Sequence, residues 1–155
     1  MKAVLISIKP DWVEKILNGE KTVEIRKTMP KLKAPFKVYI YCSKIRTAKD
    51  NFIYIKEPIG NGIYNMNPII DGKVVAEFTC DYFEKIMNIY YLEEELEAIL
   101  QGSCVSNSEF YSYIADRPCC YGWHISDLKI YDEPKIITEF NIKKAPQSWQ
   151  YVEEL

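Results

Sequence analysis

Three charged residues stand close together early in the chain, at Lys21, Glu24 and Arg26. The stretch Thr22–Arg26 alternates between polar and apolar residues, which is typical of a strand with one buried face. On such a strand Glu24 and Arg26 share a face about 7 Å apart, and Lys21 lies just before them. Arginine offers a planar fork of donors that suits a phosphate or a base edge, and lysine offers a point charge. The spacing indicates a polar ligand site, and an ordinary Glu–Arg pair on a solvated strand face is the alternative.

Two elements before this strand would hold the three residues in place. Residues 4–8 are apolar and predict an opening strand. A helix is then expected to begin at Pro10, with an apolar stripe through residues 12–17, and to end at Gly19 in a left-handed cap. A helix that runs straight into a strand would place Lys21 at the mouth of the site.

The rest of the chain predicts a single α+β domain over residues 1–155. Further strands are expected at 36–41, 73–82, 122–125 and 128–131, and two short helices at 93–100 and 108–115. Residues 47–72 are rich in Gly, Asn and Pro and lack a sustained period, so they predict an irregular excursion from the core.

The segment that carries the three charges resembles a family signature. Its residues are Gly19-Glu-Lys21-Thr-Val-Glu24-Ile-Arg26, which is similar to the G-x-K-x-x-E-x-R motif of the ASCH domain. The Lys9-Pro10 helix start and the segments Tyr121-Gly-Trp-His and Ala145-Pro-Gln-Ser-Trp also resemble ASCH proteins common in phages and prophages. The resemblance implies a PUA-like mixed β-barrel with a few short helices around it, and a cleft lined by Lys21, Glu24 and Arg26.

The same resemblance implies two possible hydrolase activities. Some similar ASCH proteins are amidohydrolases that deacetylate acetylcytidine, and others are described as ribonucleases. In the amidohydrolases the signature Lys activates a Thr two residues before the Arg, with help from a Glu of the helical segment. Lys21 matches that Lys, but Glu24 occupies the Thr position and Thr22 has the wrong spacing. If the chain is an enzyme, Lys21 and Glu24 are its catalytic candidates; the assisting acid could be Glu109 or Asp116.

Charge and aromatic content support a ligand of the nucleic-acid type. Between Lys2 and Lys49 there are twelve basic residues and four acidic ones, although the net charge of the whole chain is −2. Lys9 and Lys27 therefore join the ligand-binding candidates, and Tyr121 and Trp123 are added as rings on which a base could stack. We expect recognition of RNA or a modified nucleotide. The alternatives are the hydrolase activities above or a phage accessory domain that binds another protein.

Composition excludes several other classes. A content of 48% hydrophobic and 27% charged residues is ordinary for a globular chain, and neither a membrane span nor a signal peptide is expected, which predicts a cytoplasmic protein. The five cysteines lack the spacing of a zinc or redox motif, and His124 is the single histidine, so no metal and no cofactor are expected.

Overall fold

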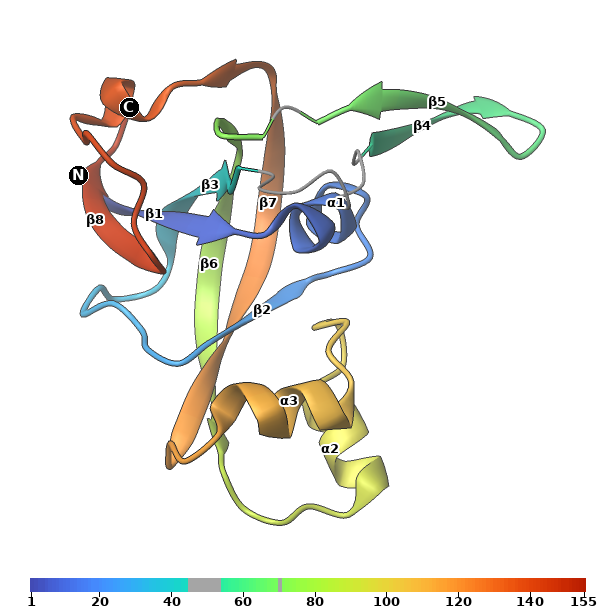
Figure 1. Ribbon diagram of the computed structural model, residues 1–155, viewed down its shortest axis with the longest axis vertical. Helices are drawn as coiled ribbons and strands as arrows, with labels where there is room; N and C mark the ends of the chain where they lie inside the picture. The colour runs from blue at the N-terminus through green and yellow to red at the C-terminus, as the bar shows by residue number, and fades with distance from the viewer. Residues whose placement is uncertain (45–53, 70) are drawn as a thin grey trace.

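The computed structural model describes residues 1–44, 54–69 and 71–155, and its main element is a mixed sheet of six strands (Figure 1). The strand order is β2-β7-β6-β3-β1-β8, and the bounds are β1 (Lys2–Ile8), β2 (Val23–Arg26), β3 (Phe36–Cys42), β6 (Val74–Met87), β7 (Cys119–Lys135) and β8 (Trp149–Glu153). The helices are α1 (Pro10–Leu17), α2 (Glu93–Ile99), α3 (Asn107–Ile114) and the 3-10 turn η1 (Ile137–Phe140). The predicted α+β class is confirmed. None of the described helices is both long and apolar enough to span a bilayer.

The predicted barrel closure does not appear as backbone pairing. In the described part of the chain β2 and β8 are the two edges of the sheet. The strand β2 has four residues and pairs only with β7, so it does not extend to the opposite edge. Instead, the Arg26 side chain connects β2 to the end of β1 by a hydrogen bond to Ser7 O.

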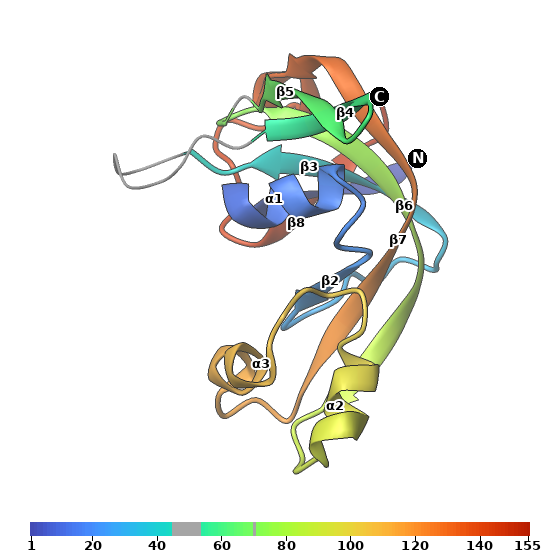
Figure 2. The same ribbon diagram turned by 90° about the vertical axis from the view of Figure 1, so that its right-hand side faces the viewer.

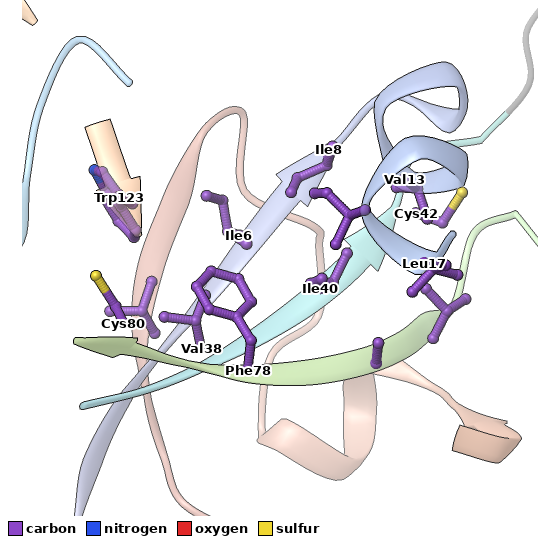
Figure 3. Close-up of a cluster of buried hydrophobic side chains, with 14 of the residues drawn as sticks. Ile6, Ile8, Val13, Leu17, Val38, Ile40, Cys42, Phe78, Cys80 and Trp123 are labelled. Atoms are coloured by element: carbon purple, nitrogen blue, oxygen red, sulfur yellow. The ribbon is translucent and has the colours of Figure 1, made fainter. Parts of the chain in front are cut away.

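The main core lies between α1 and one face of the sheet. Pro10 takes the first helical position, where its missing N–H costs nothing, and Val13, Ile16 and Leu17 form the buried stripe. Figure 3 shows Val13 and Leu17 beside Ile8 and Ile40 of the sheet. This packing fixes the start and the end of α1, which both border the site described below.

A second core surrounds the helical insert between β6 and β7. Val23 and Ile25 of β2 pack there with Ile86, Leu96 and Phe110. The insert leaves and returns at one place, because Met87 pairs with Cys119 and the Asn88 N–H donates to Pro118 O at 2.8 Å. Figures 1 and 2 show α2 and α3 at one end of the molecule. The strand β2 therefore lies against this second core through one face, and its other face carries Glu24 and Arg26.

The excursion expected to be irregular contains a regular hairpin. The strands β4 (Tyr54–Gly60) and β5 (Ile63–Pro68) pair in antiparallel fashion and project from the sheet (Figure 1). Their turn uses positive φ angles at Gly60, Asn61 and Gly62. These three residues thus mark one tight turn rather than a loop without structure. Residues 47–53 of the predicted excursion, and residue 70, lie outside the described residues.

Candidate functional site

A cavity of about 800 Å³ opens where β2, α1 and α3 meet. Figure 1 shows β2 running between the two helices. The volume lies in the range of small-molecule sites, about 300–1,000 Å³. Its charged lining residues are Lys9, Asp11, Lys21, Glu24, Arg26, Lys44 and Glu109. The three residues of the signature thus share a cavity with residues far away in the sequence.

Lys21, Glu24 and Arg26 form one buried ionic cluster. Their exposed fractions are 2%, 6% and 9%. Lys21 Nζ lies 3.3 Å from Glu24 Oε2, and Arg26 Nε lies 2.9 Å from Glu24 Oε1. The second contact is an ion pair outside hydrogen-bond geometry, since Nε has no hydrogen-bond acceptor. Two cations share one carboxylate, so the cluster carries one excess positive charge.

Further contacts fix the two cations. Lys21 Nζ donates to Ser103 O at 2.5 Å, and Arg26 Nη2 donates to Ser7 O at 2.7 Å. Arg26 Nη1 makes a longer bond of 3.4 Å to Ser148 Oγ. Each terminal nitrogen of Arg26 carries two N–H groups, so each keeps one donor beyond these contacts. Arg26 therefore ties β2 to β1 and still has donor capacity beside the cavity.

The local sequence explains this placement. Gly19 takes a φ of +74°, as expected for a helix cap, and the Lys21 N–H then donates to Lys15 O. Immediately afterwards the N–H groups of Thr22 and Val23 donate to Gly102 O. Backbone hydrogen bonds thus hold residues 19–23 as the chain leaves α1, and Lys21 lies in the middle of this stretch.

Two rings complete the walls: Trp12, which is half-buried, and Tyr113, which is 38% exposed. Trp12 from α1 lies under Lys21, whose Nζ is 4.9 Å from the ring centroid. Tyr113 from α3 lies under Lys27 at 4.9 Å. Burial raises the pKa of Tyr113, against the opposing effect of Arg26 and with a contribution from Glu24. The Tyr113 side chain is therefore a neutral phenol at neutral pH.

Of the two acids left open by the sequence, Glu109 lines the cavity and Asp116 is not among the lining residues described. Glu109 lies in the first turn of α3, and its Oε2 accepts from the N–H of Ser106 at 2.9 Å and from the Ser106 hydroxyl at 2.7 Å. These bonds hold the pKa of Glu109 below its ordinary value, with a smaller contribution from Lys15 and Lys21. Its Oε1 makes no hydrogen bond with a described residue.

The other predicted site residues fall into two groups. Lys9 lines the cavity, and Lys27 reaches the site only through the Tyr113 ring. Trp123 is fully buried in the main core, and Tyr121 lies outside the described lining, with its hydroxyl 3.8 Å from Cys119 Sγ. The Trp123 ring instead packs against Phe36 and Phe83 in the main core.

The two rings that line the cavity, Trp12 and Tyr113, were not predicted as site residues. Trp12 was part of an apolar helical stripe and Tyr113 was one of many tyrosines, so neither had a local signal of its own. The described residues contain no group of three or more His, Cys, Asp or Glu side chains that could hold a metal ion.

Comparison with known proteins places this geometry in a known fold. No family model matches the sequence, and no curated protein matches it. Among solved structures, an ASCH protein from Zymomonas mobilis is similar, with a TM-score of 0.67 and 15% identity over 98% of this chain and 88% of that chain. A point variant of the protein gives a TM-score of 0.68 and 14% identity over 99% and 92%. The chain therefore has the fold of ASCH proteins, and identities this low speak to the fold alone.

Proposed function

We propose that this chain recognises RNA or a modified nucleotide by holding one base in the cavity beside β2. The observation that carries the proposal is the buried cluster of Lys21, Glu24 and Arg26 on the wall of a cavity of about 800 Å³. Paired donors and acceptors that are fixed in advance are what a base edge requires.

The free capacity of the cluster matches such an edge. Each oxygen of Glu24 faces one cation and keeps further lone pairs, which can accept the N–H groups of a base. The spare N–H groups of Arg26 can donate to a carbonyl or ring nitrogen. Because the contacts to Ser103 and Ser7 already hold the cations, little side-chain entropy is lost when a ligand binds.

The two rings supply the apolar part of the site. Stacking of a base on an aromatic ring contributes about 1–3 kcal/mol per base. Trp12 and Tyr113 come from different helices and both line the cavity, so either ring can cover a base whose edge meets the cluster. The excess positive charge of the cluster favours an electron-rich edge or an anionic group.

The test is an anisotropy titration of labelled single-stranded RNA, with free nucleosides as competitors, at low and physiological salt. Glu24→Gln keeps the size of the side chain and removes the charge, and we expect it to weaken binding at least about tenfold. The matched control is Glu77→Gln. The Glu77 carboxylate lies outside the described lining of the cavity and pairs with Lys37, with 3.3 Å between Oε1 and Nζ. Tyr113→Ala serves as a second variant.

Equal affinities of the wild type and Glu24→Gln, with both proteins folded by circular dichroism, would remove the cluster from the binding site. Absence of binding by RNA and by every nucleoside at both salt concentrations would contradict the proposal as a whole. If Glu77→Gln weakened binding as much as Glu24→Gln does, general destabilisation of the protein, rather than lost contacts to the ligand, would explain the result.

A hydrolase acting on acetylcytidine or on RNA is the second candidate. The observation that favours it is that Lys21, Glu24 and Glu109 line one cavity, with Glu109 Oε1 free of hydrogen bonds to described residues. Thr22 is not among the described lining residues, so the acid–base groups would act on a water molecule rather than through a hydroxyl nucleophile. Chromatographic detection of cytidine or of cleaved RNA tests this, and product that persists in Lys21→Ala would exclude Lys21 as the catalyst.

A further inference from the structure

We propose that the mouth of the cavity is a phosphate subsite built by Lys9, Lys44 and the start of α1, so that the ligand is a phosphorylated nucleoside. The inference rests on the proposed function, because it assumes that the base occupies the cluster end of the cavity. It adds a second point of recognition with its own residues.

The subsite lies at the carboxyl ends of two parallel strands. β1 and β3 are the parallel pair of the sheet, and Ile8 at the end of β1 is in register with Cys42 at the end of β3. The Ser43 N–H donates to Ile8 O at 2.9 Å, which keeps the two chains together one residue further. Lys9 and Lys44 therefore leave the sheet side by side, at the kind of edge where open α/β sheets bind ligands.

The first turn of α1 begins at this edge. Lys9 is the N-cap, and its carbonyl accepts the N–H groups of Trp12 and Val13. Pro10 has no N–H, and the Asp11 N–H has no backbone acceptor among the described residues. The helix thus presents its positive dipole end and one open donor at the mouth, which favours an anion there.

The cations at the mouth differ from those inside. Lys21 and Arg26 are buried and share Glu24, whereas Lys9 and Lys44 make neither an ion pair nor a ring contact with any described residue. The Lys44 stem lies against Gly72, since a Cβ built there would meet its Cγ and Cε at 3.0 Å. Asp11 also lines the cavity and offsets one of the two charges, which leaves one positive charge in excess at the mouth.

Ser43 adds a neutral donor to this set. It lines the cavity, and its hydroxyl makes no hydrogen bond with a described residue. A phosphate in the mouth would accept from this hydroxyl, from the Asp11 N–H and from the two ammonium groups. Bonds from charged donors to phosphate are about twice as strong as neutral ones, so the lysines should dominate the affinity.

The experiment is calorimetric titration of the full chain with adenosine, cytidine, guanosine and uridine, with their 5′- and 3′-monophosphates, and with inorganic phosphate. For the base that binds, we expect at least one monophosphate to bind about tenfold more tightly than its nucleoside at low salt. In Lys9→Gln and in Lys44→Gln this ratio should fall to about 2 or less. Lys33→Gln, an exposed lysine outside the described lining, should keep it.

A dinucleotide that contains the preferred base distinguishes the two sources of phosphate, which are the phosphodiester of a strand and the phosphate of a free nucleotide. Tighter binding of the dinucleotide than of either monophosphate identifies the ligand as an internal phosphodiester of a strand, and the reverse identifies a free nucleotide. Equal affinities of nucleoside and monophosphates would overturn the subsite and leave the proposed function standing. The subsite would also be overturned if Lys33→Gln lowered the ratio as much as Lys9→Gln, or if none of these probes bound. In the last case the RNA titration described above decides whether the proposed function stands.

Discussion

Glu24 and Glu77 each contact two partner side chains, and the two carboxylates differ in what surrounds them. Glu24 lies between Lys21 and Arg26 on the cavity wall, with side chains 2–11% exposed. Glu77 lies between Lys37, at 3.3 Å, and the hydroxyl of Tyr131, which donates to it. The first cluster has two cations for one anion, and the second has one of each together with a neutral phenol.

We expect this difference to reflect a ligand-binding role of the first cluster and a structural role of the second. In the second cluster the phenol fills the second side of the carboxylate without adding charge, and Lys37 is 31% exposed, so water covers the remainder. In the first cluster Lys21 and Arg26 are almost fully buried, so neither cation can turn toward bulk water. Glu109 lines the same cavity, and its pKa is lowered in part by Lys21, so this carboxylate offsets part of the excess charge. We expect the acceptor groups of a ligand to interact with the remainder.

The largest expected loss of stability comes from a substitution that breaks the first cluster. Glu24→Leu would leave two buried cations without a counter-charge, and we expect it to lower the free energy of unfolding by ~3–5 kcal/mol. Glu77→Leu should cost less, because Lys37 can turn toward solvent. Urea denaturation followed by circular dichroism measures both values. Equal losses would mean that the two carboxylates have the same role.

A smaller effect is expected where the second cluster loses its neutral partner. Tyr131→Phe removes the hydroxyl that donates to Glu77 and keeps the ring, so it should lower the free energy of unfolding by about 1 kcal/mol. Because Tyr131 lies outside the described lining, RNA affinity should stay within about twofold of the wild type, which is less than 0.5 kcal/mol. A large loss of affinity in this variant would remove the distinction between the two clusters.

The smallest effect is a dependence on pH. Burial acts to raise the pKa of Glu77, but hydrogen bonds from Tyr131 and Lys37 outweigh it and leave the pKa below the ordinary value of 4.5. A carboxylate with a lowered pKa in the folded state stabilises the protein above its unfolded-state pKa, and this contribution is lost as the pH falls through the folded-state pKa. The stability difference between wild type and Glu77→Gln should therefore narrow below about pH 4.5. Thermal melts from pH 7 to pH 3 would show it, and a constant difference would contradict it.

Local signals predicted the half of the site that is continuous in sequence. The apolar stripe of α1, the Gly19 cap and the alternation around Glu24 all act within a few residues. Together they predict Glu24 and Arg26 on one strand face, with Lys21 just before the strand. A contact such as Arg26 with Ser7 depends on how distant strands meet, and no local pattern encodes it.

Other features had a signal that the sequence analysis did not use. Ser106 and Glu109 have the spacing of a capping box, which favours Glu109 over Asp116 as the acid held in the first turn of α3. Gly60, Asn61 and Gly62 could equally have predicted the turn of the hairpin. Trp123 has the same aromatic signal in the sequence as Trp12, but its ring packs in the main core against Phe36 and Phe83, and no local pattern distinguishes the two cases.

The helical insert between β6 and β7 has an evolutionary consequence. Its two ends meet at Met87 and Cys119, so the two strands would still pair as a hairpin if the insert were shortened or exchanged. The insert nevertheless carries Glu109 and Tyr113, which form one wall of the cavity. Gly102 and Ser103 also belong to the insert, and they accept hydrogen bonds from Thr22, Val23 and Lys21. A change in the insert would therefore alter these contacts as well as one wall of the cavity, so we expect the insert and the segment before β2 to evolve together.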